Sequence, residues 1–115
     1  MKPDAQALLW DVERAAGAIA GFVEGFDTRR YAASDVVRSA VERKFEIIGE
    51  ALGRLAKIDP KLVERIPRYR ETIAFRNLLI HGYAAVDHDR VWRIARESLP
   101  PLREAVAALL REEGD

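Results

Sequence analysis

Apolar residues recur at intervals of three and four along almost the whole chain, and no segment alternates apolar with polar residues. Spacing of three and four places apolar side chains on one face of an α-helix, whereas alternation is typical of a strand. The pattern predicts helices over residues 4–26 and, after a polar break at 27–33, over 35–58 and from 71 to 80 or 81. The predicted fold class is therefore all-α.

Helix boundaries are marked by residues that supply or lack hydrogen-bonding groups. Ser34 is expected to cap the second helix, because its hydroxyl can accept from a free amide of the first turn. Asp59-Pro60 combines a capping residue with a first-turn proline, so a short helix is predicted over 61–66. Pro67 is expected to end that short helix, because proline cannot continue the hydrogen-bonding pattern.

The C-terminal part of the chain is predicted to form one bent helix. Gly82 suits a left-handed cap after the preceding helix. Asp87 can then cap a last helix, in which Pro100-Pro101 removes two amide donors and should produce a kink. Together the elements predict a compact antiparallel bundle of four to five helices with a kinked last helix, in a single domain over residues 1–115.

Composition agrees with one domain that has a substantial core. The chain has 115 residues, of which 49% are hydrophobic, and a chain of this size buries roughly 65% of its unfolded surface. Lys plus Arg and Asp plus Glu both number 19, so the net charge of zero gives no global attraction to nucleic acid or membrane. No signal peptide or membrane-spanning stretch is recognisable, and the absence of cysteine suits a reducing cytosol. We expect a cytoplasmic protein with local anion sites and no membrane partner.

Two of the predicted helices carry glycines at every fourth position. Gly17, Gly21 and Gly25 follow one face of the first helix, and Gly49 and Gly53 repeat the spacing on the second. Each glycine costs roughly 1 kcal/mol of helix propensity, so we expect something to approach these faces closely. Tight packing within the bundle, direct ligand contact and a dimer seam are all compatible with the pattern.

The groups best suited to phosphate chemistry lie around the end of the helix predicted over 71–81, where Arg76, Asn77, His81 and Tyr83 interrupt apolar residues. Asn77 and His81 are four residues apart and share a helix face. Arg76 lies five residues before His81, rotated by roughly 140° and displaced by roughly 7.5 Å in an ideal helix. Both therefore reach one small site only through the length of arginine, through local unwinding or through a second chain.

A purely structural alternative exists for the same residues. His81 can cap the helix C-terminus while Arg76 pairs with an acid such as Glu71 or Glu50. The run Asp87-His88-Asp89 suggests a metal ligand set, but adjacent residues at a helix start point in different directions and no second ligand cluster accompanies them. The sequence predicts neither a metal site nor a cofactor.

A basic segment precedes the candidate site. Residues 61–76 hold five Lys or Arg and two Glu, which gives a net charge of +3. Tyr69 lies between Arg68 and Arg70, and interleaved aromatic and guanidinium groups suit single-stranded RNA by stacking on bases and pairing with phosphates. These three residues are RNA-binding candidates. Arg90, Arg93 and Arg96 recur three residues apart on the last predicted helix and can extend this patch. The alternative is a solvated face with ion pairs to Asp89 and Glu97.

The chain resembles HepT-type toxins of the HEPN superfamily across nearly its whole length. The resemblance rests above all on the motif Arg-x4-His-x-Tyr at 76–83, preceded by Glu-Ile-Ile-Gly-Glu-Ala at 46–51. It extends to Asp11-Val12, Ile19, Phe22-Val23, the rest of the block 40–51, Ile66-Pro67, Val91-Trp92 and Leu99-Pro100. One departure is visible, because Arg68-Tyr69 stands where the family often has tryptophan after the Ile-Pro pair.

The resemblance implies a HEPN-like fold and a metal-independent endoribonuclease that works as a homodimer, with two motifs meeting at a shared cleft. Carried onto this chain, Arg76 and His81 would be the catalytic pair, Asn77 would support the site and Tyr83 would line it. His81 would move protons at the ribose 2′-hydroxyl or the leaving oxygen, while Arg76 neutralises charge on the phosphate. The expected substrate is an RNA such as a tRNA or an mRNA, and the products would include a 2′,3′-cyclic phosphate.

The resemblance further implies the toxin component of a toxin-antitoxin system, neutralised by a minimal nucleotidyltransferase antitoxin. In similar systems the antitoxin transfers AMP to the motif tyrosine, and Tyr83 is the matching acceptor. AMP at this position would add bulk and negative charge beside Arg76 and His81. The alternative class is a non-catalytic helical module that binds a nucleotidyltransferase or a nucleotide, with the motif supplying contacts only.

Overall fold

The computed structural model describes residues 1–114, except for the side chains of Tyr83 and Glu113. The described residues form seven α-helices: α1 (Pro3–Phe22), α2 (Thr28–Ala33), α3 (Asp35–Ile58), α4 (Pro60–Val63), α5 (Tyr69–His81), α6 (His88–Arg93) and α7 (Leu99–Gly114). A 3₁₀ turn, η1 (Tyr83–Ala85), follows α5, and a π-helical segment, η2 (Ile94–Ser98), joins α6 to α7. No strand occurs in residues 1–114, and the all-α prediction is confirmed.

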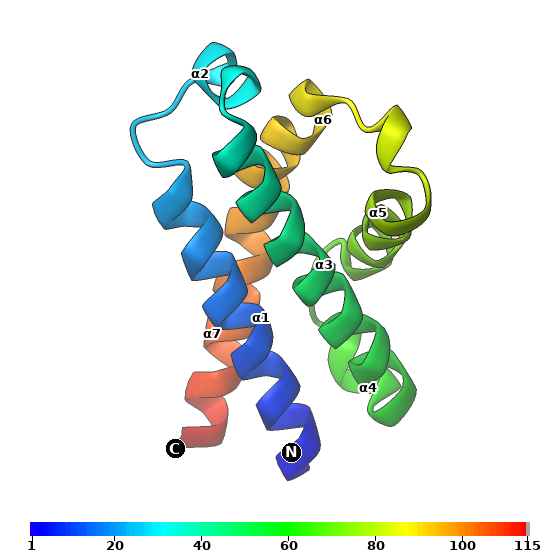
Figure 1. Cartoon of the computed structure of the whole chain (residues 1–115). Coiled ribbons are helices and arrows are strands. Elements are labelled where there is room, and N and C mark those ends of the chain that lie inside the picture. The colour runs from blue at the N-terminus through cyan, green and yellow to red at the C-terminus, as the bar shows by residue number, and fades with distance from the viewer. Residues whose placement is uncertain (115) are drawn as a thin grey trace.

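The four long helices α1, α3, α5 and α7 form the body of the bundle (Figure 1). α1 runs up from the N-terminus, α3 returns beside it in the antiparallel sense, and α7 descends behind α1. α5 packs on α3 away from α7, so α3 lies between α1 and α5. This arrangement places the helix that carries the candidate motif at one side of the bundle.

The core is made of apolar side chains from all four long helices, as their three-four spacing predicts. Its buried members include Leu9, Ile19, Phe45, Ile48, Leu52, Phe75, Leu79, Leu102 and Val106. Burying each such side chain contributes roughly 1.5 to 3 kcal/mol. Phe45 of α3 meets Phe75 of α5 edge to face with ring centroids 5.3 Å apart, which fixes the orientation of α5 on α3.

The polar break predicted at 27–33 is wrong, because residues 28–33 form helix α2. Asp27 caps it by accepting a hydrogen bond from the Arg30 N–H at 2.8 Å. Tyr31 is fully buried and its ring lies 5.4 Å from that of Trp92 in α6. A single aromatic anchor with a partner 61 positions away leaves no local hydrophobic period, so the sequence pattern missed this helix.

The first helix is also shorter than predicted, ending at Phe22 rather than at residue 26. The chain turns at Gly25, whose φ of 76° is easily adopted only by glycine. Gly25 therefore serves a turn and not a helix face. Gly17 faces Arg103 of α7, whereas a Cβ added to Gly21 would meet no described atom within 4 Å. Tight packing along the whole line of α1 glycines is thus not found.

The predicted N-caps are confirmed by hydrogen bonds. The Ser34 hydroxyl accepts from the Val37 N–H at 3.2 Å at the start of α3, and the Asp59 carboxylate accepts from the Leu62 N–H at 3.2 Å at the start of α4. Helix α4 covers Pro60–Val63 and is shorter than the predicted 61–66. Each cap satisfies one of the amides that a helix leaves free at its first turn.

Gly82 does follow α5, but the predicted left-handed conformation is wrong, since its φ is −130°. A Cβ at this position would lie 3.1 Å from Leu78 Cδ1 and 3.3 Å from the Leu78 carbonyl oxygen. The glycine is explained by this close approach, which is tighter than almost all real Cβ contacts. The chain can thereby turn directly after His81 into η1.

The last predicted helix is interrupted as expected near Pro100-Pro101, but by a π-helical segment that precedes the prolines. Asp87 caps α6 by accepting from the Asp89 N–H at 3.0 Å. In η2 the Leu99 N–H donates to the Ile94 carbonyl, five residues back. Because the two prolines bring no amide donors, the chain adjusts its hydrogen bonding here and resumes as α7. Counting the short helices α2, α4 and α6, the described chain exceeds the four to five helices expected.

Candidate active site

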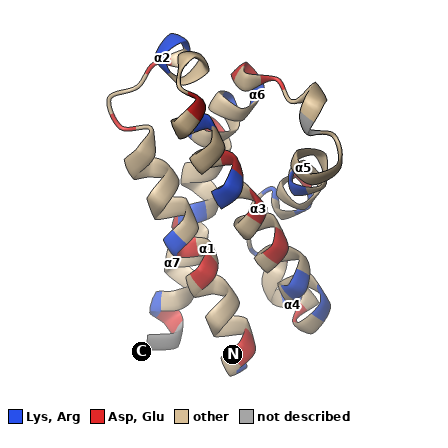
Figure 2. Cartoon of the chain, viewed as in Figure 1, with Lys and Arg blue, Asp and Glu red and all other residues tan. Residues whose placement is uncertain are grey.

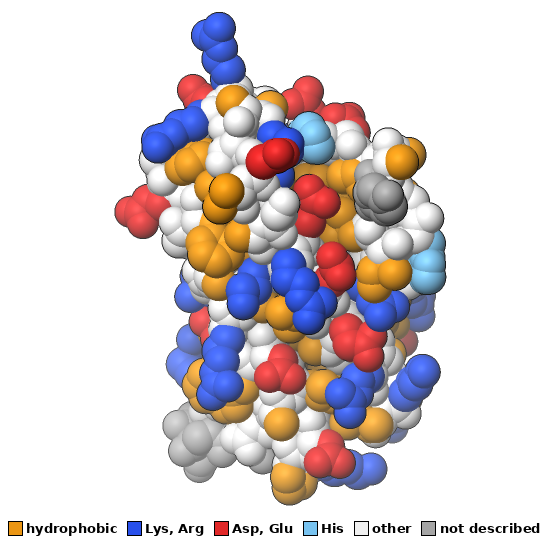
Figure 3. All heavy atoms as spheres, in the orientation of Figure 1, with side chains coloured by type: hydrophobic (Ala, Val, Ile, Leu, Met, Phe, Trp, Pro, Cys, Tyr) orange, Lys and Arg blue, Asp and Glu red, His pale blue; other side chains and the backbone are white. Residues whose placement is uncertain are grey.

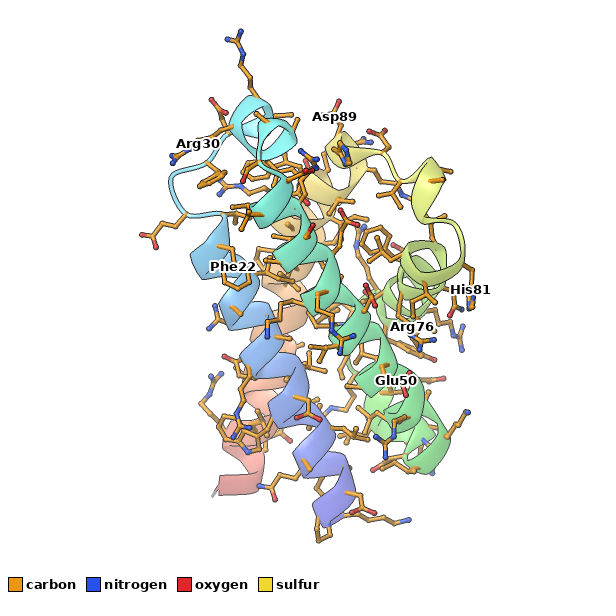
Figure 4. All side chains as sticks on the ribbon, in the orientation of Figure 1. Phe22, Arg30, Glu50, Arg76, His81 and Asp89 are labelled. Carbon is orange, nitrogen blue, oxygen red and sulfur yellow. The ribbon has the colours of Figure 1, made fainter. Side chains whose placement is uncertain are left out.

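The motif residues lie at the end of an uninterrupted helix, because α5 continues through His81. Local unwinding therefore does not bring Arg76 and His81 together. Arg76 lies on the side of α5 that faces α3, whereas His81 is exposed at the last position of the helix. Figure 4 shows Arg76 beside Glu50 of α3 and His81 at the outer edge of α5.

Arg76 is held in place by two groups. Its Nη2 lies 2.9 Å from Glu50 Oε2, and its Nη1 donates to Asn77 Oδ1 at 3.2 Å. The side chain is 29% exposed, and its Nε is buried with no hydrogen-bond partner among the described residues. The expectation that Arg76 pairs with an acid is confirmed for Glu50, whereas Glu71 lies 3.6 Å from Arg68 instead. A guanidinium with an unused buried N–H retains capacity to donate.

The close approach of α5 to α3 at this point depends on Gly49. A Cβ built on Gly49 would lie 2.2 Å from Arg76 Cβ and 3.2 Å from the Thr72 carbonyl oxygen, so no larger residue fits there. Tight packing within the bundle is thus confirmed for Gly49. Gly53, one turn later, has no described atom within 4 Å of an added Cβ, so packing does not explain it.

A hollow of about 170 Å³ opens beside the Arg76 guanidinium, between α1, α3 and α5. Its charged lining comprises Arg43, Arg54 and Arg76 together with Asp11, Glu46 and Glu50. The three cations and three carboxylates balance, and Figure 3 shows basic and acidic side chains alternating across the middle of this face. In a single copy of the chain, neighbouring carboxylates therefore offset the positive charge that Arg76 presents to a phosphate.

Of the described motif residues, only Arg76 lines this hollow. Asn77 and His81 are both exposed, and the Asn77 carbonyl oxygen is engaged by Arg76. Tyr83 begins η1, two residues beyond His81. The Tyr83 side chain, the predicted AMP acceptor, lies outside the part of the chain that the structure describes.

The three RNA-binding candidates at the start of α5 differ in their surroundings. Tyr69 is half-buried against the core, and Arg70 lies over its ring at 5.4 Å while donating from Nε to the tyrosine hydroxyl at 3.0 Å. Arg70 also lies 3.7 Å from Glu64, whereas Arg68 is exposed and points towards α6 and η2, where it meets Ser98. The Tyr69 ring is thus covered by its own neighbour, and Figure 2 shows basic and acidic residues interspersed along the helices.

A second polar cluster, missed by the sequence analysis, joins α2, α3 and α6. The Tyr31 hydroxyl and His88 Nδ1 are buried without a hydrogen-bond partner among the described residues. Burial raises the pKa of the half-buried Glu42 carboxyl; His88 and Arg38 oppose the shift, and Glu46 adds to it. Burial and the Glu42 charge likewise raise the pKa of Tyr31. The cluster brings together residues that are far apart in the chain, which explains why no local pattern marks it.

Glu42→Gln is expected to stabilise the protein at pH 7 and to lose that advantage as the pH falls. The folded protein holds the Glu42 proton more tightly than the unfolded chain does, so the wild type loses stability as pH rises from the unfolded pKa, about 4.3, through the raised folded pKa. Urea unfolding at pH 7 and pH 4.5, with the exposed Glu24→Gln as control, measures this difference. An effect of Glu42→Gln that does not change with pH would contradict it.

Residues 1–114 also lack a metal-ligand cluster and a membrane-spanning helix. Within that range no group of three or more His, Cys, Asp or Glu side chains is arranged to hold a metal ion. In the run 87–89, Asp87 is used as the cap of α6. None of the described helices combines the length and apolarity needed to cross a bilayer.

The fold and the site define a class: a small helical bundle with an Arg-x4-His-x-Tyr motif at the end of a helix packed on its central helix. The family model "Ribonuclease HepT-like" matches residues 12–109. The chain belongs to the ribonuclease HepT-like family.

Named relatives agree with this assignment. "Putative RNase MJ1380" of Methanocaldococcus jannaschii is 30% identical over 91% of this chain and 95% of that protein. "Probable ribonuclease HepT" of Thermococcus cleftensis is 31% identical over 90% of this chain and 93% of its own. "Putative RNase TTE0752" of Caldanaerobacter subterraneus is 30% identical over 79% and 80% of the two chains. No solved structure matches.

Proposed function

We propose that this member of the ribonuclease HepT-like family is a metal-independent endoribonuclease with Arg76 and His81 as its catalytic pair. The observation that carries the proposal is the intact motif in a chain that matches the family over residues 12–109. The exposed His81 is accessible to RNA, and the anchored Arg76 lines an open hollow that a phosphate can reach.

In the proposed reaction the ribose 2′-oxygen attacks the adjacent phosphorus and loses its proton. The bond from phosphorus to the 5′-oxygen of the next nucleotide breaks, and that oxygen gains a proton. The products are a 2′,3′-cyclic phosphate and a 5′-hydroxyl. His81 moves one of these protons, Arg76 stabilises the extra negative charge on the phosphoryl oxygens, and Asn77 keeps Arg76 oriented through its amide oxygen.

We further propose that the active form is a homodimer whose sites combine residues of two copies. Within one copy Arg76 and His81 lie on different sides of a straight helix, and carboxylates offset the charge beside Arg76. A second copy placed against this face would bring its His81 to the first copy's Arg76. Such an interface is symmetric, so it forms two equivalent sites.

In the cell we propose that the protein is the toxin of a toxin-antitoxin pair and that a minimal nucleotidyltransferase neutralises it by transferring AMP to Tyr83. The position of Tyr83, two residues beyond the exposed His81, supports this role. A transferred AMP carries negative charge and bulk, so it would repel and obstruct the RNA phosphate.

The proposal is tested by incubating purified, unmodified protein with total RNA in excess EDTA and analysing the cut ends. Cleavage that leaves 2′,3′-cyclic phosphates and 5′-hydroxyls is the expected result. Folded protein that leaves RNA intact with and without added divalent metal would reject the nuclease, and the non-catalytic module that binds a nucleotidyltransferase or a nucleotide would replace it. Cleavage that requires the metal would reject the proposed mechanism alone.

A further inference from the structure

A second hollow, of about 330 Å³, lies between α5 and the α6–η2 segment, away from the side of α5 that carries Arg76. We call it the α5–α6 pocket; its lining includes Arg68, Glu71, Thr72, Phe75, Arg90 and Ser98. Its volume lies at the lower end of the range for small-ligand sites. The tertiary fold creates it, because its two walls are separated in the sequence by the whole motif.

The pocket has two arginines and one glutamate in its charged lining, so its net charge is positive. Phe75 is 2% exposed and Thr72 is 7% exposed, and they form the floor. Arg90 projects from α6 with its guanidinium carbon 5.9 Å from the Phe75 ring centre. On the opposite wall the exposed Arg68 lies 3.4 Å from the Ser98 hydroxyl. Two guanidiniums against the single carboxylate of Glu71 leave a positive charge with which a phosphate can pair.

The backbone at Arg68 is unusual. With φ at 62° and ψ at 24°, it is the one non-glycine residue among those described that adopts a positive φ. The left-handed region costs a residue with a Cβ roughly 1 to 2 kcal/mol, and glycine would occupy it freely. The ion pair with Glu71 does not offset this cost, because it spans 3.6 Å between side chains that are 58% and 72% exposed. An arginine at a position that favours glycine points to a use for its side chain.

His81 lies further along α5 and on another side of the helix. In an ideal helix it is rotated by roughly 120° from Phe75, which lines the pocket. A strand of RNA that reaches His81 must therefore cross α5 to enter the pocket.

We propose that the α5–α6 pocket is a phosphate-binding subsite for the single-stranded RNA substrate, in which Arg68 and Arg90 pair with the phosphodiester. The proposal rests on the proposed ribonuclease function. It selects Arg90 from the three arginines of the last predicted helix and pairs it with Arg68 in one pocket. Tyr69, covered by Arg70, has no place in this subsite.

The test is the affinity for a fluorescent single-stranded RNA whose methylated 2′-oxygens prevent cleavage. Arg90→Gln is expected to weaken binding about 10-fold, the effect of one lost charge-assisted contact. It should also reduce the slope of log affinity against log salt by about 1. The matched control is Arg14→Gln, which removes the same charge from an exposed position on α1 and should stay within about twofold of the wild type.

The variant Arg68→Gly distinguishes a loss of RNA affinity from a loss of folding stability. Glycine relieves the positive φ, so this variant should melt at a higher temperature than the wild type while it binds the RNA more weakly. The subsite would be overturned if the wild-type protein bound no RNA. It would also be overturned if Arg90→Gln and Arg68→Gly bound RNA as tightly as the control Arg14→Gln. If the wild type cleaves RNA and neither variant weakens RNA binding, the proposed ribonuclease is supported and the subsite is rejected. Arg90-dependent binding by a protein that never cleaves unmodified RNA would instead support the subsite and reject the proposed ribonuclease.

Discussion

His81→Ala is expected to cleave RNA at least about 100-fold more slowly than the wild type, because the proposed reaction loses the group that moves its proton. Arg76→Ala is expected to lose a similar factor, since one charged donor to a developing oxyanion typically contributes 10²- to 10³-fold. Single-turnover cleavage with enzyme in excess measures both. Arg76→Lys should retain part of the rate, because lysine keeps the charge but not the two-pronged geometry.

Stability and a matched histidine serve as controls for these variants. His81 is exposed and the Arg76–Glu50 pair is partly exposed, so each alanine variant should unfold within about 1 kcal/mol of the wild type. The chain has only one other histidine, and His88→Gln should keep the cleavage rate. Folded Arg76→Ala and His81→Ala proteins that cleave normally would remove both residues from the reaction. Variants that unfold would favour the purely structural alternative.

Mixing the two inactive variants tests whether each site combines two copies. In a dimer of one Arg76→Ala chain and one His81→Ala chain, a shared site places both substitutions in one centre and leaves the other intact. Half of randomly mixed dimers have this composition, so about a quarter of the wild-type activity should return. No recovery from variants shown to exchange subunits would place Arg76 and His81 in the same chain's site.

Gly49→Ala is expected to lower the free energy of unfolding by about 1 to 3 kcal/mol, whereas Gly53→Ala should raise it by about 0.5 to 1 kcal/mol. Both changes add one methyl group to α3, four residues apart. At Gly49 the new Cβ would lie 2.2 Å from Arg76 Cβ and must push α5 away, while at Gly53 it meets no described atom within 4 Å and improves helix propensity. Urea unfolding of the two variants measures the contrast.

The Gly49 substitution should also impair cleavage, because displacing α5 moves Arg76 relative to Glu50. Gly53→Ala should cleave as the wild type does. Equal stability of the two variants would mean that α3 and α5 do not approach as closely as the structure places them. Loss of activity in Gly53→Ala without loss of stability would instead indicate that Gly53 faces a partner chain, as a dimer seam requires.

Much of the fold could be predicted from the sequence, since the long helices follow from local patterns. The three-four spacing of apolar residues located α1, α3 and α5, and the capping residues Ser34, Asp59 and Asp87 marked starts that hydrogen bonds confirm. Such signals need only neighbours within one or two helical turns. Helix α2 was not predicted, because its stability depends on the contact of Tyr31 with Trp92, which joins distant parts of the chain.

Some features of the candidate site also follow from the sequence, and others only from the tertiary structure. The sequence by itself determined which residues carry the chemistry, and it determined that Arg76 and His81 lie on different sides of one helix, because helical geometry fixes the angle between positions 76 and 81. Only the tertiary structure selected Glu50 over Glu71 as the partner of Arg76 and placed Arg90 opposite Arg68. The reason is physical: these neighbours are set by how closely helices pack, and that distance depends on side chains from separate helices, such as the absent side chain of Gly49, fitting together.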